Sequence, residues 1–476
     1  NLRISGNQIT EIKGLDGLNQ LTDLDISENQ IEEIKGMSKQ TQLKNLNIAF
    51  NKIVDVNYLR DFLSLDNIIL FNNPLKDIPQ GLLGKNDNKN SISDLKNWWN
   101  ETADSNNISE NLLVKLQVIG NGNAGKSSII EALKNGKCEK DFLSTHGVLI
   151  EHINYPVKGE PIIFQAWDFG GQEIFHGTHR LFISSESVEL IVTDFETEKF
   201  AKAGISVPDR VIANELVLHQ PIEHYIELAT RKSPSSIIVI AENKADINIE
   251  NENCIYAKAA AQNFEYCKVS ALKGIGIEKL RVIIAEKGKE LLHYGMLMPK
   301  SWLAVQQYFL DNLEMPIEDR GRIMSMGGFE TICTRYKVMK GSEQSLLKLL
   351  HHTGLIYFNK EKFKDKIITD QRWALEAIYK PLDRKSEFYD ELRNDYKGRV
   401  RVKKLFKIWG TQYTQEDKWL FLRFMQGCGL CFPLATGQKE ETEDSYYIFP
   451  QFLPENETPA AVTMWAVAKN INTYRC

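Results

Sequence analysis

Short apolar runs alternate with longer amphipathic stretches through the middle of the chain, from residue 112 to residue 272. The apolar runs read LLVKLQVIG, VLIEHINYP, PIIFQAWDF, VELIVTDF, SSIIVIAEN and FEYCKVSAL, and helical patterns follow most of them. Such alternation predicts βαβ units that share a largely parallel sheet. Because ligands of these sheets bind at the carboxyl ends of the strands, we expect an α/β domain with its site at that edge.

A different periodicity organises the first 85 residues. Asn7, Asn29, Asn51 and Asn73 recur every 22 residues, inside patterns such as LTDLDISENQI and LKNLNIAFNKI. This pattern resembles the leucine-rich repeat, in which a short strand points Leu or Ile inward and an Asn side chain holds the turn. Each repeat buries its apolar face only against its neighbours, which predicts a curved solenoid with a concave face of strands. The chain starts within a repeat, so we expect the natural protein to extend further toward the N-terminus.

A polar segment at residues 86–111 follows the repeats and is rich in Asn, Asp, Lys and Ser. Within it, Leu95, Trp98 and Trp99 fall at positions i, i+3 and i+4, which predicts one helix with an apolar face. We expect that face to pack on a neighbouring domain. The segment is therefore interpreted as an ordered linker helix and not as a free tether.

The last part of the chain, residues 298–476, mixes amphipathic helices with short strands and predicts an α+β region. The stretches VKKLFKIW, EDKWLFLRFMQGCGLCFPL and SYYIFP suggest two helices and a two-stranded wing, as in a winged-helix subdomain. Aromatic side chains at helical spacing are typical of a core. Without a concentrated basic face, DNA binding is not expected.

Composition narrows the setting of these domains. The chain has 476 residues, 42% hydrophobic and 25% charged, which is typical of a globular protein with about three domains. A net charge of −5 gives no broad attraction to nucleic acid or anionic lipid, and seven scattered cysteines argue against a disulfide framework. No apolar run approaches the roughly 20 residues of a membrane span, and no signal peptide is visible. We therefore expect a cytoplasmic protein with no membrane span.

A glycine-rich loop follows the first strand of the predicted sheet and opens a helix. It matches G-x-x-x-x-G-K-[ST], in the strand–loop–helix context that a phosphate loop requires. The N–H groups of such a loop and the positive end of its helix bind phosphates. Lys126 is expected to reach the β- and γ-phosphates, and Ser127 to ligate Mg²⁺. The predicted nucleotide-binding residues of this loop are Gly120, Asn121, Gly122, Asn123, Ala124, Gly125, Lys126, Ser127 and Ser128.

The stretch WDFGGQEIF at residues 167–175 has two interpretations. Asp-Phe-Gly is the magnesium-binding triplet of protein kinases, but the sequence shows no kinase Gly-rich loop and no His-Arg-Asp catalytic loop. Downstream of a phosphate loop, Asp168 is instead a strand-end carboxylate that holds Mg²⁺, and Gly171 brings its N–H toward the γ-phosphate. Gln172 is placed to orient the attacking water. The pattern predicts triphosphate hydrolysis, with Gln172 and Lys126 in catalytic roles.

The base is predicted from AENKADIN, which follows the strand SIIVIAE. The Asp246 carboxylate can accept two hydrogen bonds from guanine that adenine cannot offer, so the site favours GTP over ATP. Asn243 and Lys244 belong to the same motif. A second loop, formed by Ser270, Ala271 and Leu272, resembles the loop that supports guanine from the other side.

Taken in order, these motifs resemble the five motifs of a Ras-like GTPase. A repeat array that leads directly into such a domain, with WDFGGQEIFHGTH after its third strand, resembles the Roco family. The resemblance implies a Roc GTPase domain at residues 112–297 and a COR domain from residue 298 onward. It also implies that Thr145 contacts Mg²⁺ and the γ-phosphate and takes part in catalysis. The implied magnesium ligands are Ser127, Thr145 and Asp168.

The same resemblance sets the expected partners. GTP and GDP would be substrate and product, Mg²⁺ the cofactor, and the repeats a surface for a protein ligand. A COR region normally continues into a second subdomain that serves dimerisation, whereas this chain stops at INTYRC. We therefore interpret residues 298–476 as the N-terminal part of COR and expect the full-length protein to be a homodimer. No kinase signature follows in this sequence.

Two functions from different classes remain open on the sequence alone. The first is a GTP-hydrolysing molecular switch that couples nucleotide state to the arrangement of the COR and leucine-rich repeat domains. The second is a leucine-rich repeat scaffold that binds other proteins and holds guanine nucleotide with negligible turnover. Gln172 favours the first function.

Overall fold

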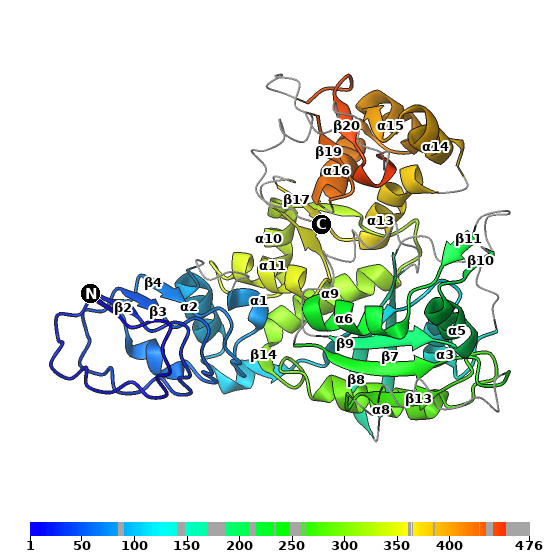
Figure 1. Cartoon of the computed structure of the whole chain (residues 1–476). Helices are drawn as coiled ribbons and strands as arrows, with labels where there is room; N and C mark the ends of the chain where they lie inside the picture. The colour runs from blue at the N-terminus through cyan, green and yellow to red at the C-terminus, as the bar shows by residue number, and fades with distance from the viewer. Residues whose placement is uncertain are drawn as a thin grey trace.

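Three lobes make up the computed structural model: an N-terminal arm, a central α/β domain and a C-terminal region above it (Figure 1). None of the helices in the described part of the chain is long and apolar enough to cross a membrane. The described residues are 1–83, 90–139, 148–157, 159–169, 187–208, 216–232, 235–247, 259, 262–359, 363, 365–383, 386–427, 429–434 and 441–453.

The arm is a stack of four short parallel strands, joined in the order β1-β2-β3-β4. These strands are β1 (Leu2–Arg3), β2 (Asp23–Asp25), β3 (Asn45–Asn47) and β4 (Asn67–Ile69). The register places Leu24 beside Leu46 and Leu46 beside Ile68, so one turn of the stack equals one sequence repeat. These three side chains are almost fully buried. The periodic apolar positions therefore form a continuous core along the arm.

Asparagine side chains join successive turns of this stack. The Asn51 amide donates to the carbonyl oxygens of Ile48 and Ala49 in its own turn, and to that of Ile26 one turn earlier. Its oxygen accepts from the Ile31 N–H at 3.0 Å. Asn29 and Asn73 make equivalent bonds, and these three asparagines are buried. Buried backbone groups of each turn are thus satisfied by an amide from a neighbouring turn.

The linker helix α2 (Ile92–Glu101) lies between the arm and the C-terminal region. Leu95, Trp98 and Trp99 are buried, as the helical spacing predicts, and the Trp98 ring meets the Trp302 ring edge-on at 5.4 Å. One apolar cluster contains residues of the repeats, of α2 and of the first half of the C-terminal region. The arm and that half of the C-terminal region therefore share a core.

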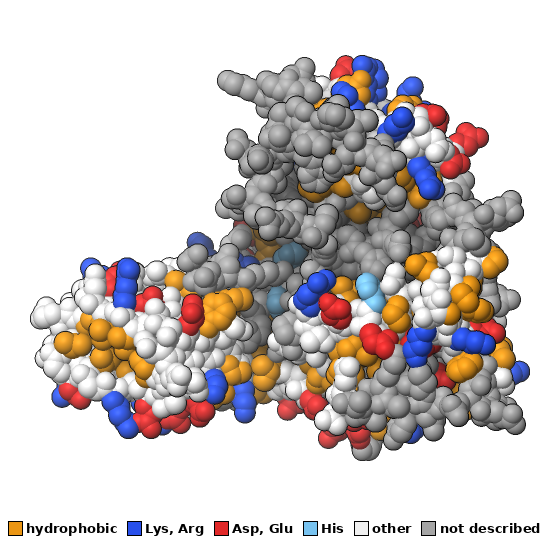
Figure 2. All heavy atoms as spheres, in the orientation of Figure 1, with side chains coloured by type: hydrophobic (Ala, Val, Ile, Leu, Met, Phe, Trp, Pro, Cys, Tyr) orange, Lys and Arg blue, Asp and Glu red, His pale blue; other side chains and the backbone are white. Residues whose placement is uncertain are grey.

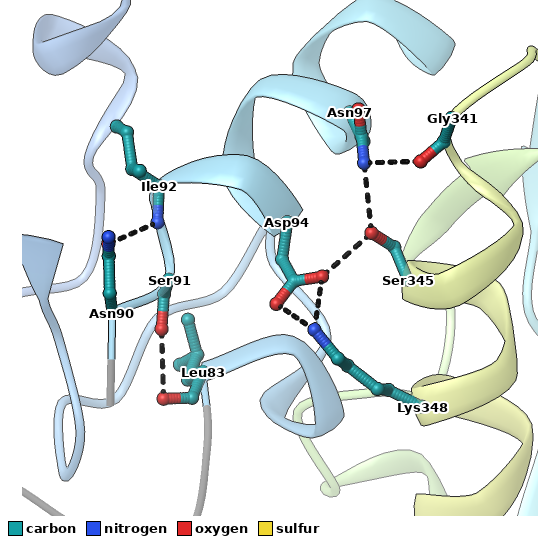
Figure 3. A network of polar contacts seen from close by, with 9 residues as sticks. All are labelled: Leu83, Asn90, Ser91, Ile92, Asp94, Asn97, Gly341, Ser345 and Lys348. Atoms are coloured by element: carbon teal, nitrogen blue, oxygen red, sulfur yellow. Dashed lines mark hydrogen bonds and ion pairs between the residues drawn. The ribbon is translucent and has the colours of Figure 1, made fainter. Parts of the chain in front are cut away.

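Polar contacts reinforce this shared core (Figure 3). The buried Asp94 carboxylate accepts from Lys348 Nζ at 2.6 and 2.8 Å and from Ser345 Oγ at 2.8 Å. Asn97 donates to the Gly341 carbonyl oxygen at 2.9 Å. At the end of α2, Glu101 accepts from the Trp302 indole N–H at 3.1 Å and from the Met339 N–H at 2.8 Å. Both carboxylates of α2 are thus saturated by donors of the C-terminal region.

The central domain is built on a six-stranded sheet in the order β13-β12-β9-β6-β8-β7, parallel except for β7. Its strands are β6 (Leu113–Ile119), β7 (Val148–Val157), β8 (Glu160–Phe169), β9 (Val188–Thr193), β12 (Ile237–Glu242) and β13 (Glu265–Lys268). The helices among its described residues are α3 (Lys126–Asn135), α5 (Phe195–Ala203), α6 (Ile222–Lys232) and α8 (Ile277–Lys289). A hairpin, β10 (Ser206–Pro208) and β11 (Leu216–Leu218), precedes α6.

The two faces of the central sheet have different covers. Helices α3 and α8 pack on one face, in a cluster with Leu116 and Leu190. On the other face, α6 and the C-terminal region share a cluster with Trp167 and Ile191. Alternation of side chains along the strands explains why neighbouring positions belong to different clusters.

The C-terminal region has two small antiparallel sheets, β15-β17-β16 and β18-β20-β19, and its entry strand β14 pairs with β5 of the linker. Its first half contains β14 (Leu297–Pro299), α9 (Lys300–Glu314), β15 (Ile323–Ser325), α10 (Met326–Arg335), α11 (Glu343–His352), β16 (Tyr357–Phe358) and β17 (Lys366–Ile368). Its second half contains α13 (Gln371–Tyr379), α14 (Glu387–Asp390), β18 (Arg399–Arg401), α15 (Val402–Trp409), α16 (Gln415–Gly427), β19 (Phe432–Pro433) and β20 (Tyr446–Ile448). The linker strand β5 is Ile108–Glu110, and the short helix α1 is Gln80–Leu83.

Candidate functional site

The predicted phosphate loop joins the buried strand β6 to helix α3. Gly120 has a φ of +143°, and a Cβ atom there would lie 2.1 Å from the Val192 carbonyl oxygen. Only glycine fits such an approach of the loop to β9. Within the loop Ala124 is buried, Asn123 is exposed, and Gly122, Gly125 and Ser128 are half-buried. The loop therefore curls against the carboxyl end of the sheet, as the motif predicts.

Lys126 points into the curl of this loop. Its ammonium donates to the carbonyl oxygens of Gly120 at 3.0 Å and Asn121 at 2.8 Å, and the side chain is buried. Burial lowers the pKa of Lys126 to about 8, and attraction to Asp168 opposes that shift. The arrangement holds one cation at the centre of the loop, where a phosphate oxygen can replace the backbone carbonyls as its acceptor.

Ser127 and Asp168 meet beside this lysine. Ser127 Oγ donates to Asp168 Oδ2 at 2.5 Å, and Asp168 is fully buried at the end of β8. A hydroxyl and a carboxylate oxygen are the ligand types that Mg²⁺ prefers. Because the two oxygens come from different elements and converge at the loop, these residues fit a magnesium ion held next to a phosphate.

Asn243 connects the base motif to both other loops. Its amide donates to the Ala124 carbonyl oxygen at 3.1 Å, and its oxygen accepts from the Ala271 N–H at 3.1 Å. A Cβ atom on Gly125 would lie 2.2 Å from Asn243 Nδ2, so this glycine makes room for the contact. The sequence predicted Asn243 as a nucleotide-binding residue, whereas in the structure its side chain ties the phosphate loop to the loop of residues 270–272.

The rest of the base motif surrounds this contact. Lys244 pairs with the buried Asp194 at 3.0 Å, and Asp194 also caps helix α5 by accepting from the Thr197 N–H. Asp246 is half-buried. Sequence reasoning missed Asp194, although its position directly after strand β9 follows the same strand-end rule that located Asp168.

The supporting loop is divided between core and surface. Ser270 and Ala271 are buried, whereas Leu272 is 61% exposed. The Ala271 carbonyl oxygen accepts from the Cys138 N–H at 2.7 Å, beyond the end of α3. The three loops therefore converge at one edge of the sheet, with Leu272 at the rim.

Asn121 directs its side chain away from the phosphate loop. Its side chain is buried and bonds Gln220 and Tyr225, so it faces the start of α6. Its backbone carbonyl, by contrast, faces Lys126. Sequence reasoning missed Gln220 and Tyr225, which lie far along the chain from the loop and carry no motif. The predicted residues Thr145, Gly171 and Gln172 lie outside the described residues.

Two family models match this chain. The model described as "Ras of Complex, Roc, domain of DAPkinase" matches residues 115–246. The model described as "C-terminal of Roc, COR-A domain" matches residues 299–453. The first covers the phosphate loop, Asp168 and the base motif, and the second covers the C-terminal region from the start of α9.

Curated relatives show the same pairing of domains. A "Roc-COR-CHAT protease" of Runella zeae is 25% identical over 363 residues, which is 72% of this chain and 35% of the relative. The "Probable serine/threonine-protein kinase roco11" of Dictyostelium discoideum is 27% identical over 222 residues, 42% of this chain and 13% of the relative. The chain thus spans about a third or less of the length of these relatives.

A solved structure has a similar fold. The structure of Methanosarcina barkeri Roco2 RocCORdC bound to GDP aligns with a TM-score of 0.54 at 22% identity, covering 73% of this chain and 97% of that one. The two family models in tandem and the Roc-COR relatives establish that the chain belongs to the Roco family, of the prokaryotic type, with a Roc domain of the Ras-like GTPase class followed by a COR region.

Proposed function

We propose that this protein binds GTP, hydrolyses it to GDP and phosphate, and acts as a molecular switch. The observation that carries the proposal is the convergence of three groups at one sheet edge. Lys126 lies inside the phosphate loop, the Ser127–Asp168 oxygen pair stands beside it, and Asn243 joins the base motif to the same loop. These are the residue types that P-loop enzymes use for phosphoryl transfer: a loop lysine, and a Ser or Thr and an Asp that hold Mg²⁺.

Each residue then has a distinct task. Lys126 and the loop N–H groups neutralise the β- and γ-phosphates, and Ser127 and Asp168 hold Mg²⁺. The ion would add positive charge where the phosphate oxygens become more negative during hydrolysis. From the sequence pattern, Gly171 contacts the γ-phosphate and Gln172 orients the water; from the family resemblance, Thr145 contacts Mg²⁺ and the γ-phosphate. Asp246 reads guanine, with Asn243 and the loop of residues 270–272 holding it in place.

Domain assignments follow the same proposal. The four-strand arm with its buried asparagines supports leucine-rich repeats, and β18, α15, α16, β19 and β20 support a winged-helix-like unit. The proposed domains are leucine-rich repeats at 1–85, an ordered linker at 86–111, Roc at 112–297 and the N-terminal part of COR at 298–476. We also propose that the full-length protein dimerises through COR.

The core shared by the repeats and COR suggests which parts of the switch move together. Because α2 fastens the repeats to the first half of COR, these parts move as one body (Figure 3). Nucleotide state would then change the position of Roc against that body. The arm exposes Leu18, Val54 and Leu63, and Figure 2 shows apolar side chains along its visible face between charged ones. These features support the arm as a docking surface for a protein ligand.

Calorimetric titration with GDP, GTP and ATP tests the binding. We expect guanine nucleotides to bind and ATP to fail, and Lys126→Ala to abolish binding with the repeats still folded. Lys134→Ala is a matched control, because Lys134 lies on the same helix but pairs with Glu151 on the surface. If Lys126→Ala kept the parent affinity, the site assignment would be wrong.

Base choice has its own test. Asp246→Asn should weaken guanine binding and shift preference toward xanthine nucleotides, because an amide can donate to the carbonyl that xanthine adds. Unchanged discrimination between the two bases would mean that another residue reads the base.

Single-turnover phosphate release separates the switch from the scaffold. We expect Gln172→Leu to keep GDP and GTP affinity within about threefold and to slow hydrolysis by about tenfold or more, near 1.4 kcal/mol of barrier. A parent chain that binds GTP but releases no phosphate, alone or extended through the whole COR region, would favour the scaffold that uses nucleotide without turnover.

A further inference from the structure

Asn121 is the one long side chain that the phosphate loop sends into the core. Its neighbours Gly120 and Gly122 have no side chain, and Asn123 is exposed. Glycines on both sides leave the backbone of Asn121 with wide conformational freedom. The groups that hold its side chain therefore help to fix where its carbonyl lies, and that carbonyl accepts from Lys126 at 2.8 Å.

Three hydrogen bonds hold the Asn121 amide. Its nitrogen donates to the Gln220 carbonyl oxygen at 2.7 Å. Its oxygen accepts from the Gln220 N–H at 2.9 Å and from the Tyr225 hydroxyl at 3.0 Å. Because the Gln220 backbone offers one donor and one acceptor, only one orientation of the amide satisfies both. Asn121 and Tyr225 are each about nine-tenths buried or more, so water competes little for these bonds.

The support behind these bonds is rigid. The segment at Gln220 leads into α6, whose first N–H, that of Ile222, donates to Glu198 Oε2 at 3.0 Å. Tyr225 packs its ring edge-on against His224 at 5.3 Å. Ile222 and Tyr225 belong to the apolar cluster that the sheet shares with COR. The amide is therefore anchored to a packed helix and not to another loop.

We propose that Tyr225 and the backbone of Gln220 are positioning groups that hold the phosphate loop through Asn121 and thereby set how long guanine nucleotide stays bound. The inference rests on the proposed function and adds to it the Tyr225 hydroxyl and the N–H and carbonyl groups of Gln220. Without this brace, the backbone between Gly120 and Gly122 samples conformations that do not surround the phosphates. Since GDP and GTP share the β-phosphate, both dissociate faster by the same factor.

Dissociation of a fluorescent N-methylanthraniloyl GDP from the full chain measures the effect. Tyr225→Phe keeps the ring in the core and removes only the hydroxyl, which should speed release about threefold; Asn121→Ala removes all three bonds and should speed it about tenfold or more. In the double variant the two effects should be less than multiplicative, because both substitutions remove the hydrogen bond between the Tyr225 hydroxyl and Asn121. Tyr294→Phe is the matched control, since its exposed hydroxyl bonds Pro161 at 3.2 Å in the same domain, and it should leave the rate unchanged.

Two further measurements separate positioning from a purely structural role. Melting of the nucleotide-free variants should stay near the parent temperature, while the GDP-induced rise in melting temperature shrinks. The corresponding non-hydrolysable GTP analogue should show the same factor as GDP. Unchanged dissociation in Tyr225→Phe and Asn121→Ala, multiplicative effects in the double variant, or a faster release that only follows a lower melting temperature would each overturn the inference. A parent chain that binds no GDP would overturn the proposed function as well. A parent chain that binds GDP, with variants that release it at the parent rate, would overturn this inference alone.

Discussion

The COR region makes two junctions, and they are held in different ways. Against α2, it donates hydrogen bonds to the buried carboxylates of Asp94 and Glu101. Against the Roc sheet, the COR backbone at Gly354 packs closely on the Trp167 ring, since a Cβ atom on Gly354 would lie 2.8 Å from that ring. The Gly354 carbonyl oxygen also accepts from Gln165 at 3.3 Å. Both junctions contain a shared apolar cluster; buried carboxylates add hydrogen bonds to the first, and a close contact between Gly354 and the Trp167 ring is a feature of the second.

The two junctions also differ in how close they lie to the proposed nucleotide site. Trp167 directly precedes Asp168, so the ring that touches COR and the carboxylate proposed to hold Mg²⁺ sit on adjacent residues of β8. Asp94 and Glu101 lie on the linker helix, away from the phosphate loop. We therefore expect a change at the proposed nucleotide site to affect the second junction through β8. The first junction keeps repeats and COR together while that happens.

The largest effect is expected from Glu101→Ala at the first junction. The substitution removes the acceptor of the buried Trp302 indole N–H and of the part-buried Met339 N–H, and the unsatisfied indole together with the lost contacts should cost about 2–4 kcal/mol of the free energy of unfolding. Urea unfolding followed by tryptophan fluorescence measures the loss. A cost below about 0.5 kcal/mol would show that the apolar core alone holds the repeats to COR.

The second junction is tested by Gly354→Ala. The added methyl must displace the Trp167 ring, and Gly354 also has a φ of +80°, so we expect a loss of about 1–3 kcal/mol and an altered GDP dissociation rate. Gly159→Ala is the matched control: its φ is +85°, with nothing within 4 Å of the added atom, so it pays the backbone cost alone. Equal losses in the two variants would mean that Trp167 moves freely.

A pH effect is expected at the same face of the sheet. Glu189 is fully buried there, and burial raises its pKa to about 7. The folded state thus keeps a proton that the unfolded chain releases near pH 4.5, so this contribution to stability is complete below about pH 4.5 and disappears as the pH rises through 7. Glu189→Gln should flatten stability between pH 5 and pH 8, by about 1–2 kcal/mol. Chemical denaturation at both pH values measures it, and a parallel pH dependence in the two proteins would contradict the assignment.

The smallest effect is expected from Asn97→Ala, at the rim of the first junction. Its amide donates to the Gly341 carbonyl oxygen at an exposed position and to Ser345 Oγ at 3.2 Å. Because both bonds join neutral groups and water can replace the first, the cost should stay below about 1 kcal/mol. The free energy of unfolding of this variant, measured in the same assay as that of Glu101→Ala, compares a contact at the edge of the junction with one at its centre. A loss as large as that of Glu101→Ala would show that the junction is not held by its buried carboxylates.

The sequence predicted the features that local patterns determine. The 22-residue period, the phosphate loop and the strand-end position of Asp168 each follow from residues close together in the chain, and the structure contains them. The partners of side chains across domains were not predictable in this way. Glu101 meets Trp302, which lies 201 residues away, and no pattern around Glu101 indicates that contact.

Asn121 shows the same limit inside the site. The motif predicts that its backbone faces the phosphates, because any residue can supply an N–H there. The direction of its side chain depends on Tyr225, 104 residues away, and on how α6 packs against the sheet. Conversely, the roles of Gly171 and Gln172 rest on the sequence pattern and that of Thr145 on the family resemblance, because these residues lie outside the described part of the structure.

The asparagine bonds of the arm have a consequence for its growth in evolution. Each buried Asn closes its own turn and the one before it with the same set of bonds, spaced 20 and 25 residues apart along the chain. Duplication or loss of one whole 22-residue unit would therefore recreate every bond type at the new seam, whereas an insertion of any other length would leave an orphaned amide there. The length of the arm can therefore change by whole repeats. Its reach can lengthen or shorten in steps of one turn without redesign of the Roc domain or of the contacts between α2 and COR.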